Sequence, residues 1–265
     1  MFRGEMVAFG EALVRPQETK QQCRPTTRLS SYLVVALLLT ALTLPAFRHA
    51  PAALGIVERG PASEPRVALT FDDGPDPRFT PEILNILERE GVPATFFVVG
   101  EAMAAYPDVV KRAADGGFEI ANHTYTHTLA GALTPKEIRQ EITRTSDLIR
   151  QMTGQEPRYL RPPRGELTGH FILEARRQGL RIPLWTICVE KAEVKTPEAL
   201  ARRIVEETEN GHIILLHDGR LDRRLTVQAL PLIISGLKER GFAFVTLDEL
   251  LHGYAGVMTL DEPVL

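Results

Sequence analysis

The chain has few cysteines and no excess of charge of either sign, and both shortages narrow its class. Only two of its 265 residues are cysteine, and Cys23 and Cys188 are far apart in the sequence. We therefore predict no structural disulfide, and two separate thiols leave the redox compartment undetermined. With 31 basic and 34 acidic residues, the formal net charge is −3. This gives no general attraction to nucleic acid, so we expect no nucleic-acid partner.

Internal repeats and low-complexity tracts are absent as well. The composition is 44% hydrophobic and 25% charged, which is ordinary for a globular protein. A length of 265 residues suits one large domain with an appendage.

One long apolar run is present, from Leu29 to Phe47, and basic residues precede it. A basic flank followed by an uncharged core is typical of export. The run is either a signal peptide, cleaved near Ala50-Pro51-Ala52, or a membrane anchor, since about 20 apolar residues span a bilayer. A buried core helix is disfavoured because the run is isolated. Under both interpretations the protein is exported, extracellular or periplasmic, or anchored in the cytoplasmic membrane facing outward, and residues 29–47 are the candidate for membrane association.

The remaining boundaries follow from composition. We expect a basic N-terminal region (1–28), the apolar run, a linker rich in Ala, Pro and Gly (48–64), one domain (65–254) and a tail (255–265).

Within the domain, apolar segments alternate with amphipathic ones. Predicted strands cover 66–71, 94–99, 118–121, 159–160, 180–185, 212–216 and 242–246. Predicted helices cover 80–90, 101–115, 134–152, 168–178, 196–208, 225–240 and 247–252. Those beginning at 80, 134 and 196 open with Thr-Pro, a threonine cap followed by proline in the first turn. This alternation predicts an α/β fold with a parallel sheet closed, or nearly closed, into a barrel.

Polar or aromatic side chains follow most of the predicted strands. Asp72 and Asp73 follow the first strand, and strands further along are followed by groups around His123, Arg161 and His217. In barrels of parallel strands the active site lies at the carboxyl ends of the strands, so these groups are expected to meet on one face. Trp185, the single tryptophan, ends another predicted strand. It is equally consistent with core packing.

The convergent groups predict a metal-dependent hydrolytic site. His123 and His127 are four residues apart, a spacing that places both imidazoles on one side of a helical turn. With one aspartate they form a set of three ligands, the pattern of catalytic zinc, and the other aspartate can act as base. Spacing alone does not say which aspartate has which role. Arg161 can keep the base ionised, and His217 can protonate a leaving amine.

Four motifs resemble those of the polysaccharide deacetylases with a NodB homology domain, carbohydrate esterase family 4. They are TFDDGP (70–75), HTYTH (123–127), RPPRG (161–165) and LLH (215–217). The resemblance covers about residues 66–251 and implies a distorted (β/α)7 barrel. The implied substrate is an N-acetylated polysaccharide or oligosaccharide. The RPPRG motif is similar to that of the subgroup that deacetylates peptidoglycan.

The resemblance also assigns roles residue by residue. It implies that Asp72 is the base, that Arg161 orients it, and that His217 is the acid. Asp73, His123 and His127 would bind the metal, usually Zn²⁺, with Co²⁺ or Mn²⁺ as alternatives. The three implied substrate-binding residues are Arg164, whose backbone N–H would hold the oxyanion, Leu215, which would line the acetyl pocket, and Trp185.

Two departures from the family pattern keep other functions open. Many members have Tyr where this chain has Arg164, which changes the charge of the pocket. The family's fourth motif has aspartates where this chain has Cys188 and Lys191, and a second Trp where it has Ala192. Glu190, Glu193 or Asp218 could take over the support of His217. The alternatives to peptidoglycan N-deacetylation are a non-catalytic carbohydrate-binding protein, a chitin-oligosaccharide deacetylase and an acetyl-ester hydrolase.

Overall fold

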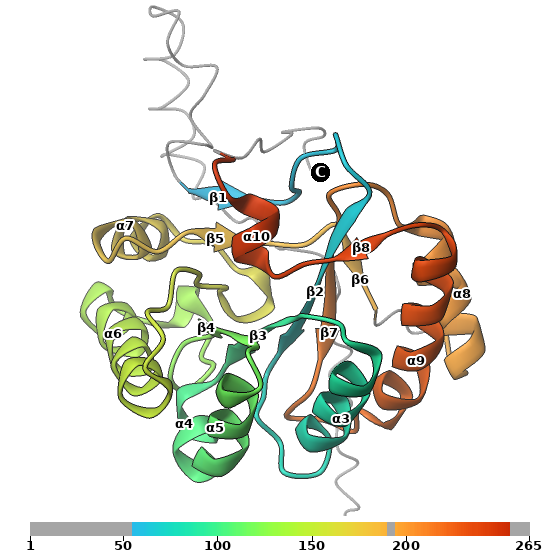
Figure 1. Cartoon of the computed structure of the whole chain (residues 1–265). Helices are drawn as coiled ribbons and strands as arrows, with labels where there is room; N and C mark the ends of the chain where they lie inside the picture. The colour runs from blue at the N-terminus through green and yellow to red at the C-terminus, as the bar shows by residue number, and fades with distance from the viewer. Residues whose placement is uncertain (1–54, 190–193, 255–265) are drawn as a thin grey trace, which may run out of the picture.

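The computed structural model describes residues 55–189 and 194–254, and Figure 1 shows them as a central group of strands surrounded by helices. The strands are β1 (Ile56–Val57), β2 (Arg66–Asp72), β3 (Thr95–Val98), β4 (Glu119–Asn122), β5 (Ile182–Pro183), β6 (Ile187–Cys188), β7 (Ile213–His217) and β8 (Ala243–Phe244). The α-helices are α3 (Thr80–Glu90), α4 (Gly100–Ala105), α5 (Pro107–Asp115), α6 (Pro135–Thr153), α7 (Gly169–Arg177), α8 (Pro197–Glu207), α9 (Arg224–Glu239) and α10 (Leu247–Leu251).

The main sheet is parallel, which confirms the predicted α/β class. Its order is β4-β3-β2-β7-β6, and β8 pairs with the start of β2. A separate parallel pair, β1-β5, is linked toward β4 through the isolated bridges Asn122↔Leu160 and Tyr159↔Arg181. The strand pairing of the described residues therefore follows a curved path, but it does not confirm a closed barrel.

Alternating side chains on β2 separate the two hydrophobic clusters of the core. Val67, Leu69 and Phe71 belong to the cluster between the sheet and the outer helices, which includes residues of α3 and α9. Ala68 belongs to the inner cluster, on the other face of the strand. Because side chains on a strand alternate with a period of two, Asp72 shares the inner face. The last residue of a buried strand therefore directs a carboxylate inward.

Four of the described α-helices, α6, α7, α8 and α10, begin after a threonine whose side chain caps the helix. Thr134 caps α6 in a capping box with Glu137, and the Thr196 side chain caps α8. The predicted helix over 101–115 is divided into α4 and α5 at Pro107, because proline lacks the N–H that a continuous helix needs. The predicted threonine cap of α3 is wrong. Thr80 is the first helical residue, and its hydroxyl donates instead to Asp218 Oδ2 at 2.6 Å.

Several sequence-based predictions differ from the structure. The range expected to be a linker contains β1 and Arg59, which forms an antiparallel bridge with His212. The strand expected over 180–185 is shorter, and β6 was not anticipated. Cys188 is disulfide-bonded, so the prediction of no disulfide is wrong. Cys23 and the apolar run 29–47 lie outside the described residues. Within the described part, no helix is long and apolar enough to cross a membrane.

Candidate active site

The register of the parallel sheet brings the predicted residues to one edge. Asp72 on β2 is paired with His217 on β7, and the backbone N–H of Asp218 donates to the Asp72 carbonyl at 3.1 Å. His123 directly follows β4, and its N–H donates to the Val98 carbonyl at the end of β3. Arg161 follows Leu160, and its N–H donates to the Asn122 carbonyl. The predicted convergence of strand ends is confirmed, although the observed ends of the strands differ from the predicted ones by a residue or two.

Asp73, His123 and His127 form the described group of side chains that could hold a metal ion. One ligand atom from each lies within 4.8 Å of the others. Asp73 Oδ1 is 2.9 Å from Nε2 of His127 and 3.6 Å from Nε2 of His123. Nδ1 of His123 donates to the Arg161 carbonyl at 2.8 Å, which leaves Nε2 with its lone pair toward Asp73. A hydrogen bond that fixes the tautomer in this way is typical of metal-ligating histidines.

The protonation states of Asp73 and His127 also favour the binding of a cation. Burial alone would raise the pKa of Asp73, but the contacts with His123 and His127 and the charge of nearby His217 outweigh it, so its pKa lies well below its ordinary value. Burial lowers the pKa of His127, and the contact with Asp73 offsets this only in part. At neutral pH the group therefore offers a carboxylate and a neutral imidazole. The residues fit a divalent metal with nitrogen and oxygen ligands.

The two histidines are brought together by a loop and not by a helical turn. Thr124 and His127 have left-handed backbone angles, with φ of 67° and 60°, and Asp73 has φ of 76°. Such conformations cost a non-glycine residue roughly 1–3 kcal/mol each, and they persist where surrounding contacts impose them. The two imidazoles therefore lie close together as the spacing predicted, but the predicted helical turn is wrong.

Arg161 is buried and holds Asp72 in place. Its Nη1 donates to Asp72 Oδ1 at 2.7 Å and to Thr70 Oγ1 at 2.9 Å. Nε and Nη2 donate to the carbonyls of Pro183 and Leu184, and the guanidinium lies 4.0 Å from the centre of the Phe97 ring. Asp72 Oδ2 is 3.7 Å from Nε2 of His123. The Asp72 carboxylate is therefore fixed on one side by arginine and faces the proposed metal ligands on the other.

The other predicted site residues occupy different environments. Leu215 and Trp185 are buried in the inner cluster, and Trp185 lies 5.8 Å from the Arg161 guanidinium. Arg164 is exposed and has a left-handed backbone with φ of 56°. His217 is buried at the end of β7.

Asp218 does not provide the alternative support suggested for His217. Its Oδ2 accepts the Thr80 hydroxyl, and burial raises its pKa to about 7. Lys191 and Ala192 of the altered fourth motif lie outside the described residues.

Arg223 is a site residue that sequence reasoning missed. It is buried, and its Nη2 donates to Asp73 Oδ2 at 3.0 Å while Nε donates to the Gly219 carbonyl at 2.7 Å. The Asp73 carboxylate thus has one oxygen toward Arg223 and the other toward the histidines. No local signal marks this arginine, because its role depends on the turn after β7 packing on the turn after β2.

Two glycines permit that close packing. A Cβ on Gly74 would lie 2.1 Å from Asp218 Oδ2, and a Cβ on Gly219 would lie 2.1 Å from the Asp73 carbonyl oxygen. Real Cβ atoms do not approach other atoms so closely, so both positions need glycine. This explains in steric terms why glycine follows the paired aspartates.

Comparison with known proteins shows the family of the chain and agrees with its fold. Residues 59–183 match the polysaccharide deacetylase family. The chain is 36% identical over 196 residues to a peptidoglycan-N-acetylglucosamine deacetylase of Bacillus cereus, covering 73% of this chain and 70% of the relative.

Two solved structures of similar chains are informative. One is a peptidoglycan N-acetylglucosamine deacetylase in complex with 4-naphthalen-1-yl-N-oxidanyl-benzamide, with a TM-score of 0.71, 34% identity, and coverage of 74% of this chain and 92% of that one. The other is a pseudoenzyme of carbohydrate esterase family 4 from Bacillus anthracis, with a TM-score of 0.69, 29% identity, and coverage of 74% and 68%.

The fold and these matches define a carbohydrate-acting hydrolase of carbohydrate esterase family 4. The chain belongs to the polysaccharide deacetylase family.

Proposed function

We propose that this enzyme removes N-acetyl groups from amino sugars of peptidoglycan and that the reaction depends on a divalent metal, most simply Zn²⁺. The observation that carries the proposal is the buried group of Asp73, His123 and His127, whose ligand atoms lie within 4.8 Å of one another beside the Asp72–Arg161 pair. When bound, the metal would lower the pKa of water and polarise the acetyl carbonyl. Asp73, His123 and His127 would hold it.

The chain's own residues supply the proton transfers. Asp72, oriented by Arg161, takes a proton from the attacking water while the water oxygen bonds to the acetyl carbon. His217 donates a proton to the sugar nitrogen as the carbon–nitrogen bond breaks, so that acetate and a free amine leave. Asp72 and His217 are paired across β2 and β7, and this proximity supports the proposal that they act as base and acid.

Substrate contacts are assigned on the same basis. We propose that the backbone N–H of Arg164 stabilises the oxyanion and that Leu215 and Trp185 form an apolar pocket for the acetyl methyl. The burial of both apolar side chains in the inner cluster supports this assignment. A preorganised N–H donor in a water-poor site is an effective way to stabilise developing negative charge.

The metal and the substrate class are supported by the relatives. One similar structure contains an N-hydroxybenzamide, a hydroxamic acid, which is a group that chelates divalent metals. The names of two relatives specify N-acetylglucosamine of peptidoglycan. We further propose that the strands close into a distorted (β/α)7 barrel and that the enzyme acts outside the cytoplasm. The second of these is supported by the apolar run 29–47 and its basic flank.

A non-catalytic carbohydrate-binding function is the second candidate. The residues at 188, 191 and 192 depart from the family's fourth motif, and a similar structure is a pseudoenzyme. Such a protein would bind the glycan without releasing acetate. Retention of Asp72 favours catalysis, because metal binding alone does not need this carboxylate.

Acetate release tests the proposal. Full-length protein loaded with zinc is incubated with peptidoglycan and, separately, with chitin oligomers, beside an Asp72→Asn control. We expect acetate from peptidoglycan with the unaltered enzyme and loss of release with the control. Release from chitin oligomers alone would reassign the substrate, and glycan binding without any acetate would favour the second candidate.

A further inference from the structure

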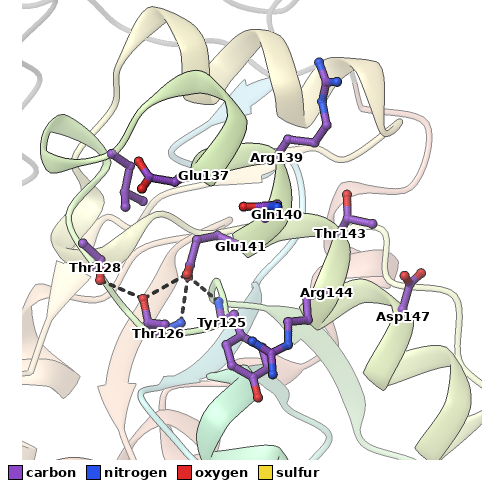
Figure 2. A pocket seen from close by; sticks show the side chains of 11 residues that line it. Tyr125, Thr126, Thr128, Glu137, Arg139, Gln140, Glu141, Thr143, Arg144 and Asp147 are labelled. Carbon is purple, nitrogen blue, oxygen red and sulfur yellow. Dashed lines mark hydrogen bonds between the residues drawn. The ribbon is translucent and has the colours of Figure 1, made fainter.

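A groove of about 750 Å³ lies between α6 and the loop that carries His127. Tyr125, Thr126 and Thr128 line it from the loop, and residues of α6 line it from the other side. In Figure 2 the Glu141 side chain projects from α6 to the loop, and dashed hydrogen bonds join it to Tyr125 and Thr126. Thr143 and Asp147 of the same helix make none of the interactions drawn there.

Glu141 satisfies three donors of the loop with one carboxylate. Its Oε2 accepts the backbone N–H of Tyr125 at 2.8 Å and that of Thr126 at 2.7 Å. Its Oε1 accepts the Thr126 hydroxyl at 3.0 Å. Hydrogen bonds to an ionised acceptor are stronger than those between neutral groups, so this contact fixes two consecutive peptide units. Thr126, whose N–H belongs to the second unit, is the residue immediately before His127.

Other hydrogen bonds also hold this loop in place. The hydroxyls of Thr126 and Thr128 lie 2.7 Å apart, so the residues on either side of His127 are joined. From the start of α4, the N–H groups of Gly100 and Glu101 donate to the carbonyls of Thr124 and Tyr125. The loop is therefore held by α4 through its carbonyls and by α6 through its N–H groups.

We propose that Glu141 is a positioning residue that directs His127 toward the metal. This inference rests on the proposed function, because it treats His127 as a metal ligand. His127 has φ of 60°, a conformation that a histidine does not prefer, and its Nε2 nevertheless lies 2.9 Å from Asp73 Oδ1. External contacts must impose this conformation, and Glu141 supplies those nearest in sequence to His127. Without them the imidazole would sample other directions and the ligand set would lose its preorganisation.

Three variants of the full-length protein separate this role from general stability. Glu141→Leu removes every acceptor. Glu141→Gln keeps them in a neutral form, since its amide oxygen can accept both backbone N–H groups and its NH₂ can donate to the Thr126 hydroxyl. Asp147→Leu is the matched control, because it removes an exposed carboxylate of the same helix that only pairs with Arg150.

The readouts are zinc affinity by chelator competition, the visible spectrum of the Co²⁺ form, and circular dichroism to verify folding. For Glu141→Leu we expect a loss of zinc affinity of about 10- to 100-fold, the usual effect of removing an outer-shell partner, and an altered Co²⁺ spectrum. For Glu141→Gln we expect an affinity within about threefold of the unaltered protein, because neutral hydrogen bonds replace charged ones without loss of geometry. Asp147→Leu should leave affinity and spectrum unchanged.

A folded Glu141→Leu protein with unchanged zinc affinity and Co²⁺ spectrum overturns the inference. Equal losses in Glu141→Leu and Glu141→Gln also overturn it, because they would show that charge and not the hydrogen-bonded geometry matters. If Glu141→Leu does not fold, Glu141→Asp takes its place, since its carboxylate is one methylene too short to reach both N–H groups. Unchanged affinity in that variant would again refute the inference. Failure of the unaltered protein to bind zinc is a different result and rejects the proposed function itself.

Discussion

Replacing Arg161 by methionine is expected to remove most of the stability of the fold. The guanidinium is fully buried and hydrogen-bonded to Asp72, Thr70 and the carbonyls of Pro183 and Leu184. Breaking a buried ion pair by removing one partner costs about 3–5 kcal/mol. Leaving two buried carbonyls without donors adds roughly 1–3 kcal/mol each. The sum approaches the whole unfolding free energy of an ordinary domain, about 5–15 kcal/mol.

A double variant shows how much of that cost comes from the unpaired carboxylate. Arg161→Met combined with Asp72→Asn contains no unpaired buried charge, so we expect it to recover about 2–3 kcal/mol relative to Arg161→Met alone. Urea unfolding followed by circular dichroism measures each variant, with the slope checked for two-state behaviour. Arg161→Lys keeps the charge but not the planar donor fork. Its unfolding free energy should lie between those of Arg161→Met and the double variant, and it provides a foldable comparison. A cost below about 1 kcal/mol for Arg161→Met, or a double variant no more stable than it, would show that the buried ion pair does not stabilise the fold in this way.

Three further predictions concern other sites. Burial raises the pKa of Glu119 to about 7, so ionisation of this carboxyl should lower the unfolding free energy by about 1–3 kcal/mol as pH rises from about 4.5 to 7; Glu119→Gln should remove this part of the fall in urea titrations, while the part due to Asp218 remains. Gly74→Ala would place a Cβ 2.1 Å from the Asp218 carboxylate, and we expect it to cost about 1–3 kcal/mol in unfolding free energy, measured by urea denaturation, and most of the acetate release. Arg223→Met removes the donor to Asp73 Oδ2 and should weaken zinc binding about 10- to 100-fold in chelator competition, where an unchanged affinity would show that the contact is incidental.

Local chemistry made most of the fold predictable from the sequence. The Thr-Pro pairs before α6 and α8 predicted both helix starts, because a threonine cap and a proline in the first turn act within a few residues. The convergence of Asp72, His123, Arg161 and His217 was predictable for a different reason. Parallel strands direct all their carboxyl ends to one edge, so the order of strands along the chain was enough.

What could not be predicted depends on contacts between distant segments. Arg223 and Glu141 look like ordinary surface residues in the sequence, and only the packing of loops on one another makes them neighbours of Asp73 and of the His127 loop. Thr80 has the pattern of a helix cap, but a buried carboxylate on another loop competes for its hydroxyl. The short strand β1 has too few residues for an alternating pattern, and its pairing with β5 defines it.

The proposed function requires a single metal ion, held by Asp73, His123 and His127, for deacetylation. Protein stripped with a chelator is titrated with Zn²⁺ while acetate release from peptidoglycan is measured. We expect no release from the stripped protein and a linear rise to a plateau at one zinc per chain. His127→Ala should give no such rise at the same zinc concentrations. Full activity in the metal-free protein, or zinc bound at this site without any acetate released, would reject metal-dependent deacetylation.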